Sequence, residues 1–329
     1  MLELRNPEAP VITTEATAWT RKDLLDTDTM TASELQLVMD TAEGMREVRS
    51  RPVAKVATLR GVTVITLFYE QSTRTRASFE VAAKALGADV VNLTASGSSV
   101  EKGETLIDTV RTLEAIGADL VVMRHGKSGA PYLAARNTSA GIINGGDGTH
   151  AHPTQALLDL FTMRRHVGDV AGRKVVIVGD VLHSRVARSN LWTLLASGAD
   201  VTLCGPATLL PRTLAAQASE AGRCEVTNNM DQAIAGADIV MALRMQKERQ
   251  EKGLIPSLRE YISGYQVNAR RLALAKPGAL VMHPGPMNEG IEISPEVAHG
   301  MASVIEEQVA NGVAVRMAIL YLMATARHA

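Results

Sequence analysis

Short apolar runs alternate with segments of helical period along most of this chain. In the first half the apolar runs lie at residues 62–69, 88–93, 120–123 and 141–144. In the second half they lie at residues 174–178, 200–204, 238–243 and 280–282. Runs of this length, rich in Val, Ile and Leu, are typical of strands buried on both faces of a parallel sheet.

Amphipathic segments fill most of the gaps between these runs, and local signals mark where some of them begin. Thr31 and Glu34 form a capping box, which predicts a helix reaching about Val48. Pro153 stands at a first helical position and predicts a helix over residues 154–166. Further helices are predicted at residues 76–86, 105–116, 132–137, 186–195, 211–221, 232–235 and 306–326. Residues 205–210 and 253–265 are interpreted as loops or short helices, and residues 1–20 as an arm without a clear period.

The alternation of strand and helix predicts an α/β fold made of two doubly wound parallel-sheet domains. A chain of 329 residues is too long for one typical core, which also favours two domains. The two halves resemble each other in architecture and not in sequence.

Composition narrows the class of protein. The 34 Lys and Arg residues nearly balance the 35 Asp and Glu residues, so no charge excess points to nucleic acid or to an anionic membrane. No uninterrupted apolar run reaches the roughly 20 residues that span a bilayer, and the first residues do not form a secretory signal. Cys204 and Cys224 do not have a metal-ligand spacing and are typical of a reducing compartment. We therefore expect a cytoplasmic protein without a metal centre.

Polar clusters follow six of the predicted strands. They occupy residues 70–76, 124–125, 147–155, 180–185, 244–249 and 283–286. In an open parallel sheet, ligands bind beyond the carboxyl ends of the strands. The clusters contribute the cations Arg74, Arg124, Arg185 and Arg244, with Lys102 as a further candidate. A cationic cleft in a nearly neutral protein predicts a pair of small anions, such as a phosphate and a dicarboxylate.

The first cluster contains Ser72-Thr73-Arg74-Thr75-Arg76 at the junction of a strand and a helix. Hydroxyls, guanidinium groups and the free N–H groups of a helix start together favour a phosphate site. The segment has no Gly-rich cradle and no Walker lysine, which excludes an NTPase loop. The alternative is ordinary N-capping beside two solvated arginines.

The other clusters also have structural interpretations. His152-Pro-Thr-Gln155 is either a plain helix start or a pair of groups that bind a carbonyl oxygen and a small amide. Residues 244–249 are either a solvated charge run or an anion site. Asp147 is by default a turn residue, and His125 and His183 are by default structural.

Residues 179–185 join a predicted strand to a predicted helix, as the phosphate-binding turn of a dinucleotide fold does. The second and third glycines that would admit a pyrophosphate are absent. Arg185 near the helix start is suited to a carboxylate instead, so a dehydrogenase is disfavoured.

Five segments taken together resemble the aspartate/ornithine carbamoyltransferase family. They are residues 68–80, 102–106, 123–125, 146–155 and 244–249, and the resemblance extends from about Trp19 to the last helix. Ornithine enzymes carry a cysteine in a late His-Cys-Leu-Pro turn, whereas this turn reads His283-Pro-Gly-Pro286. The resemblance therefore implies transfer of the carbamoyl group of carbamoyl phosphate to L-aspartate, giving N-carbamoyl-L-aspartate and phosphate in pyrimidine synthesis, without a cofactor.

The resemblance also implies a role for each matching residue. Catalysis would involve Arg74, Thr75, Lys102, Arg124 and His152. Carbamoyl phosphate would be bound by Ser72, Thr73, Arg74, Thr75, Ser98, Lys102, Arg124, His152 and Gln155. Aspartate would be bound by Lys102, Arg185, Arg244 and Gln246, and the domains would close through Glu70, Asp180 and Arg249.

In the family, the residues matching Ser98 and Lys102 reach into a neighbouring subunit, which implies a homotrimer with active sites at the subunit interface. The first domain would comprise residues 1–152 plus a returning helix 306–329 and bind carbamoyl phosphate. The second would comprise residues 153–305 and bind aspartate. Whether a regulatory chain or dihydroorotase associates is left open.

Two features depart from the family pattern. The late turn usually continues to an arginine, but Glu289 stands here, and the arm before Trp19 is longer than the family needs. Two rival hypotheses are a carbamoyltransferase for another carboxylated amine and a non-catalytic scaffold. The intact set of Arg74, Lys102, Arg124, His152, Arg185 and Arg244 argues against the scaffold.

Overall fold

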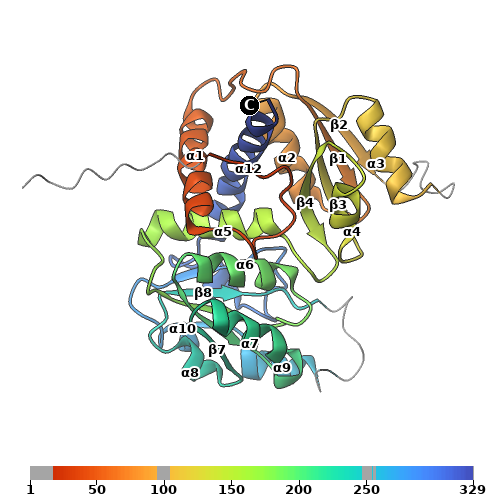
Figure 1. Ribbon diagram of the computed structural model, residues 1–329. Coiled ribbons are helices and arrows are strands. Elements are labelled where there is room, and N and C mark those ends of the chain that lie inside the picture. Colours follow the sequence, from red (N-terminus) through yellow and green to blue (C-terminus); the bar gives the residue numbers. More distant parts are fainter. Residues whose placement is uncertain (1–17, 95–103, 247–253, 255–256, 329) are drawn as a thin grey trace, which may run out of the picture.

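The computed structural model describes residues 18–94, 104–246, 254 and 257–328. Figure 1 shows two halves, each built on a parallel sheet with helices packed against it. The strands of the first half are β1 (Thr63–Phe68), β2 (Asp89–Thr94), β3 (Leu120–His125) and β4 (Gly141–Asp147). Its helices are α1 (Ala32–Ser50), α2 (Thr73–Ala85), α3 (Leu106–Ala115) and α4 (Ala130–Ala135). The predicted α/β fold with two parallel sheets is confirmed.

The second half repeats the architecture with one more strand. Its strands are β5 (Lys174–Val178), β6 (Asp200–Cys204), β7 (Cys224–Thr227), β8 (Ile239–Ala242) and β9 (Leu280–Met282). The helices are α6 (Arg185–Ala196), α7 (Arg212–Ala221), α8 (Met230–Ile234), α9 (Leu258–Tyr265), α10 (Ala269–Leu272) and α11 (Pro295–Ala298), with a 3-10 turn at Ala207–Leu209.

Strand order fixes where each sheet can hold a ligand. The first sheet has the order β2-β1-β3-β4 and the second β7-β6-β5-β8-β9, and all neighbouring strands within these two sheets are parallel. The order reverses between β1 and β3 in one sheet and between β5 and β8 in the other. Such switch points leave a crevice beyond the carboxyl ends of the strands. The polar clusters that follow β1, β3, β5 and β8 therefore meet at two crevices.

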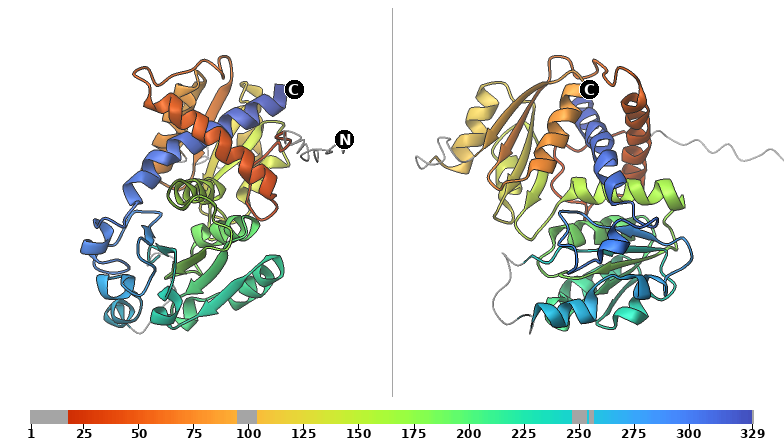
Figure 2. Two further views of the ribbon diagram at one scale, coloured as in Figure 1. Left: turned by 90° about the vertical axis from the view of Figure 1, so that its left-hand side faces the viewer. Right: turned by 180° about the vertical axis from the view of Figure 1, so that it is seen from behind.

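Two helices join the halves. Helix α5 (Pro153–Val167) packs against α1, α6 and α12, and α12 (Ile305–His328) packs against α1, α2 and α5. Figure 2 shows α12 running from the second half back across the first. By length and composition α12 could cross a membrane, but 67% of its apolar window is buried inside the protein. It is thus a core helix, and its buried side chains belong to one apolar cluster that includes residues of both halves.

Candidate active site

The loop after β1 places hydroxyl groups at the start of α2. Ser72 is the N-cap of this helix, and its side-chain oxygen accepts a hydrogen bond from the Thr75 N–H at 3.4 Å. The two hydroxyl oxygens of Ser72 and Thr75 lie 3.0 Å apart. No acidic residue occupies the first turn of α2, so its positive end is available to an anion. Capping and anion binding, the two interpretations of this segment, are compatible.

Arg74 extends from this helix start to the late turn after β9. A Cβ atom added to Gly285 would overlap Arg74 Nη1 and lie 2.9 Å from Arg74 Cζ. Gly285 also has φ +61°, which favours glycine, and the missing Cβ leaves room for this guanidinium. Burial, with a further contribution from the positive charge of Arg244, lowers the pKa of Arg74.

Glu70 holds two guanidinium groups from different sheets. Its carboxylate lies 2.5 Å from Arg124 Nη2 at the end of β3 and 2.6 Å from Arg185 Nη2 at the start of α6. Arg124 also donates to the Gly145 carbonyl at 3.1 Å, and Arg185 donates to the Gly148 carbonyl at 3.2 Å. One carboxylate cannot neutralise two guanidinium groups, so positive charge remains at this junction.

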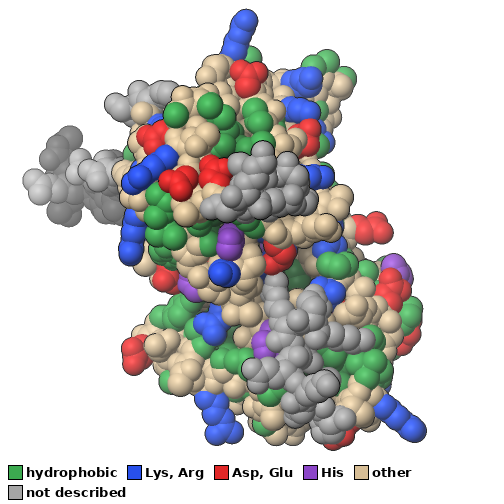
Figure 3. All heavy atoms as spheres, turned by 90° about the vertical axis from the view of Figure 1, so that its right-hand side faces the viewer, with side chains coloured by type: hydrophobic (Ala, Val, Ile, Leu, Met, Phe, Trp, Pro, Cys, Tyr) green, Lys and Arg blue, Asp and Glu red, His purple; other side chains and the backbone are tan. Residues whose placement is uncertain are grey.

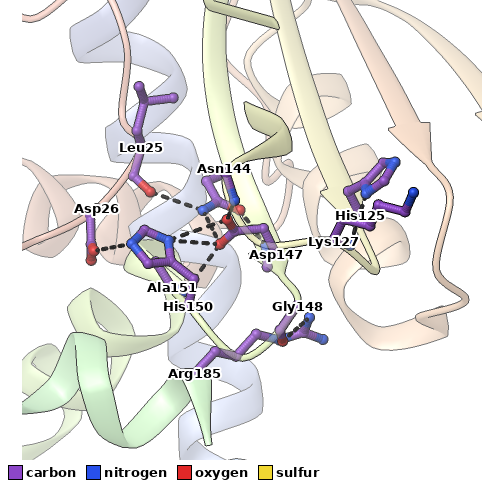
Figure 4. A network of polar contacts seen from close by, with 12 residues as sticks. Leu25, Asp26, His125, Lys127, Asn144, Asp147, Gly148, His150, Ala151 and Arg185 are labelled. Atoms are coloured by element: carbon purple, nitrogen blue, oxygen red, sulfur yellow. Dashed lines mark hydrogen bonds and ion pairs between the residues drawn. The ribbon is translucent and has the colours of Figure 1, made fainter. Parts of the chain in front are cut away.

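The loop that these arginines contact is held by a buried carboxylate. Asp147 accepts hydrogen bonds from Asn144 Nδ2 at 2.9 Å, Gly129 N–H at 2.7 Å and Ala151 N–H at 3.0 Å. Its carboxylate also lies 3.2 Å from His150 Nδ1 (Figure 4). Asp147 is therefore more than a turn residue, because it fixes the loop that presents the Gly148 carbonyl to Arg185.

His152 lies at the start of α5, directly after that loop. Its side chain is buried, and Nδ1 has no hydrogen-bond partner among the described residues. Burial, together with the positive charges of Arg124, Arg185 and Arg316, holds the pKa of His152 well below its usual range. The ring is thus a neutral imidazole that can donate from one nitrogen and accept at the other.

Arg244 and His283 follow adjacent strands of the second sheet. His283 is buried, and its pKa is lowered by burial and by the nearby charges of Arg74 and Arg244. Gln246 is half-buried two residues beyond Arg244. Figure 3 shows several Lys, Arg and His side chains at the surface near the waist between the two halves.

Arg316 on α12 belongs to the same cluster and was not predicted. Its guanidinium is buried and lies 5.2 Å from the ring centre of Phe79. The positive charge of Arg316 contributes to the lowered pKa of His152, and the charge of Arg74 contributes to the lowered pKa of Arg316. Burial lowers the pKa of Arg316 to about 10, while Asp159 opposes this shift. A lone arginine among Val313, Ala314, Val315 and Met317 was a usable sequence signal, because arginine is almost never fully buried without a partner.

The positive charges of the predicted cations act on the pKa values of neighbouring groups. The charge of Arg244 contributes to the lowered pKa of Arg74, and the charge of Arg74 to that of Arg316. The charges of Arg124, Arg185 and Arg316 contribute to the lowered pKa of His152. Gln155 lies on the first turn of α5 beside His152. Like charges held this close favour binding of anions.

Other predicted positions contribute less or are not described. Asp180 is buried and lies 2.8 Å from His183 Nδ1 within its own loop. Glu289 lies 3.3 Å from His299 Nε2, with both side chains exposed. Ser98, Lys102 and Arg249 lie outside the described residues. Within the described ranges, no group of three or more His, Cys, Asp and Glu side chains could hold a metal ion.

Two family models match most of the chain. The carbamoyl phosphate-binding domain of aspartate/ornithine carbamoyltransferases matches residues 22–165, and the Asp/Orn-binding domain matches residues 171–323. The chain belongs to the aspartate/ornithine carbamoyltransferase family.

Individual relatives narrow the comparison. The aspartate carbamoyltransferase catalytic subunit of Roseiflexus sp. (strain RS-1) is 60% identical over 301 residues, which are 92% of this chain and 94% of the relative. The structure of aspartate transcarbamoylase from Trypanosoma cruzi in complex with carbamoyl phosphate and aspartate matches with a TM-score of 0.84 and 29% identity, over 93% of this chain and 99% of that chain. Ornithine carbamoyltransferase from Pyrococcus furiosus matches with a TM-score of 0.84 and 30% identity, over 93% and 98% of the two chains. The backbone alone therefore does not separate the two substrates.

Proposed function

We propose that this chain transfers the carbamoyl group of carbamoyl phosphate to the amino group of L-aspartate, as the catalytic subunit of an aspartate carbamoyltransferase. The supporting observation is that Arg124 and Arg185, from different sheets, share the Glu70 carboxylate, while Arg74 lies against Gly285 of the late turn. The positive charge of Arg244 also acts on Arg74, whose pKa it helps to lower. The 60% identity to a relative of that name supports aspartate over ornithine as the acceptor.

The phosphate lies at the start of α2 in this proposal. Backbone N–H groups and hydroxyls of Ser72, Thr73 and Thr75 surround it, and Arg74 and Arg124 neutralise it. Lys102 and Ser98 complete this half of the site, and Gln155 binds the carbamoyl amide.

The reaction builds negative charge on the carbamoyl oxygen as the amine attacks. Thr75, Arg124 and neutral His152 stabilise that oxygen, and donors of this kind are each worth about 2.7–4 kcal/mol of barrier. The C–N bond forms as the C–O bond to phosphate breaks, and the departing phosphate accepts the proton of the amine. Because these donors are all protein groups, the reaction needs neither metal nor cofactor.

Aspartate is held through its two carboxylates. Arg185 and Arg244 bind them as guanidinium forks, with Gln246 beside them and Lys102 as a further ligand. Glu70, Asp180 and Arg249 orient these arginines when the halves close. Glu70 already joins Arg124 to Arg185, so one carboxylate connects the two substrate subsites.

We further propose a cytoplasmic homotrimer, in which Ser98 and Lys102 enter the site of a neighbouring subunit. In this proposal one domain comprises residues 1–152 and 306–329, and the other comprises residues 153–305. Mixing Arg74→Ala and Lys102→Ala trimers under exchange conditions should restore activity, because some hybrid interfaces contain both intact residues. No recovery after demonstrated exchange would place the whole site within one chain.

Phosphate release tests the activity itself. The protein is incubated with carbamoyl phosphate and with aspartate, ornithine or no acceptor, and N-carbamoylaspartate is measured in parallel. We expect phosphate and N-carbamoylaspartate in equal amounts with aspartate alone. Release with ornithine alone, or no release with any acceptor, would overturn the proposal.

A further inference from the structure

Asp159 is a buried carboxylate beside the site that the proposed reaction does not use. It lies on α5, one helical turn beyond Gln155, and its side chain is inaccessible to solvent. A buried carboxylate is costly unless several donors satisfy it, so its partners indicate why it is there.

Three side-chain amides from three helices donate to this carboxylate. Oδ1 accepts from Gln155 Nε2 at 2.9 Å and from Gln308 Nε2 of α12 at 2.8 Å. Oδ2 accepts from Asn190 Nδ2 of α6 at 2.8 Å. Burial raises the pKa of Asp159 to about 6 and the three donors oppose that rise, so the group is mainly ionised at neutral pH. An ionised carboxylate is acceptor-only, so each amide must turn its NH₂ end toward it.

The orientation of Gln308 provides an independent check. Its Oε1 accepts the backbone N–H of His283 at 3.0 Å, while its Nε2 donates to Asp159. If the two ends of this amide were exchanged, its NH₂ group would face the His283 N–H and its oxygen would face the Asp159 carboxylate. Neither pair could form a hydrogen bond. The same carboxylate therefore also helps to fix the late turn that Arg74 contacts.

The amide of Gln155 is oriented by its hydrogen bond to Asp159, as the amide of Gln308 is. With its NH₂ end directed to Asp159, the carbonyl oxygen is the end of this amide that is not bound to that carboxylate. A carbonyl oxygen can accept a hydrogen bond from an NH₂ group and offers nothing favourable to a methyl group. Carbamoyl phosphate and acetyl phosphate differ in this single replacement.

We propose that Asp159 is a positioning residue that fixes the amide of Gln155 with its oxygen toward the acyl group, and thereby makes the site prefer carbamoyl over acetyl phosphate. The inference rests on the proposed function, since it assigns a substrate contact to Gln155. Asp159 acts through Gln155 and does not touch the reacting atoms.

The test compares three ligands that share the phosphate. Steady-state kinetics with saturating aspartate give kcat/KM for carbamoyl phosphate, and competition gives inhibition constants for acetyl phosphate and for inorganic phosphate. The ratio of the acetyl phosphate inhibition constant to the KM of carbamoyl phosphate measures discrimination. Asp159→Leu removes every acceptor, whereas Asp159→Asn keeps one oxygen and nearly the same volume.

We expect discrimination to fall about tenfold in Asp159→Leu and about three- to fivefold in Asp159→Asn, as for one substrate hydrogen bond lost or weakened in a buried site. The inhibition constant of inorganic phosphate should change less than about twofold. In a Gln155→Leu background, Asp159→Leu should change the ratio no further, because the group through which it acts is gone. If Asp159 had a purely structural role, Asp159→Leu would weaken the binding of all three ligands together. Its effect would then also add to the effect of Gln155→Leu in the double variant.

Asp238→Asn is the matched control. Asp238 is also a nearly buried carboxylate with three donors, Lys174 N–H at 3.0 Å, Lys276 Nζ at 2.7 Å and Arg173 Nη1 at 3.2 Å. It precedes β8, at the opposite end of the sheet from the site, so discrimination should stay at the wild-type value in this variant.

If Asp159→Leu does not fold, Asp159→Asn decides. A ratio within about twofold of wild type in the folded Asp159 variants would overturn the inference while leaving the proposed function intact. Absence of phosphate release by the wild-type protein would instead overturn the proposed function.

Discussion

In the first half of the molecule the anion-binding groups are placed by backbone elements, whereas in the second half they depend on side chains from across the junction. Ser72 caps α2, and Arg124 sits at the end of β3 between its two neighbouring strands. Arg185, by contrast, is held by Glu70 of the first half and by the Gly148 carbonyl. The described residues of the phosphate subsite therefore belong to the first half, while Arg185 of the carboxylate subsite depends on a contact between the two halves.

Removing a cation from the phosphate half should have the largest effect. Arg74→Ala and Arg124→Ala should each lower kcat by about 10²–10³, since each deletes a charged donor where charge develops. Arg223→Ala is the control, because Arg223 is an exposed side chain paired with Asp200 on the surface. Stopped-time phosphate release measures all three. A loss below tenfold in both Arg74→Ala and Arg124→Ala would contradict the placement of the phosphate.

A substitution in the second half should instead weaken the binding of aspartate. Arg244→Lys keeps the charge but loses the guanidinium fork, so KM for aspartate should rise about ten- to hundredfold. KM for carbamoyl phosphate should change less than about threefold. The two constants are measured by varying each substrate while the other is saturating. Equal effects on both constants would show that the two subsites are not separate.

Glu70→Gln tests the connection between the halves. The substitution keeps the size of the side chain but loses the charge that holds Arg124 and Arg185, so both guanidinium groups become less constrained. We expect kcat/KM for aspartate to fall about three- to tenfold, with a smaller effect on phosphate binding. An unchanged kcat/KM would mean that Glu70 has no influence on the aspartate subsite.

The smallest expected effect concerns stability against pH. Because the pKa of His152 is lowered in the folded protein, the unfolded chain takes up a proton first as pH falls through about 6.5, and folding loses stability. This histidine should contribute a loss of about 1 kcal/mol in the free energy of unfolding between pH 6.5 and 5.5. Urea unfolding of wild type and His152→Asn at both pH values measures this loss, which should be smaller in His152→Asn by about that amount.

The control for that measurement is His299→Asn, an exposed histidine beside the exposed side chain of Glu289. This variant should keep the wild-type dependence on pH. If His152→Asn loses as much stability on acidification as wild type, the histidine is not buried in its neutral form.

The sequence predicted the fold because its strongest signals are local. The capping box of Thr31 and Glu34 and the helix start at Pro153 are confirmed. The edge strand β7 was missed, because Glu225 and Val226 are exposed and the strand is only four residues long. The short helices α10 and α11 were missed because four residues carry too little periodicity.

The sequence allowed prediction of those site residues that lie at or just after the ends of strands. Arg74, Arg124, Arg185 and Arg244 all follow strands, as the sequence analysis anticipated. Arg316 and Asp159 lie in the middle of helices, where sequence position says nothing about which partner they meet. Only the packing of α12 against α2 and α5 brings these two residues to the site.

The most direct test of the central claim is the affinity of one molecule that joins a phosphonate to aspartate. If cations of both sheets form a single site for two anions, this compound should bind at least about 10² times more tightly than inorganic phosphate or aspartate. Arg74→Ala and Arg244→Ala should each weaken it by at least about tenfold in a calorimetric titration. Binding no tighter than that of phosphate, or binding unaffected by Arg244→Ala, would contradict the claim.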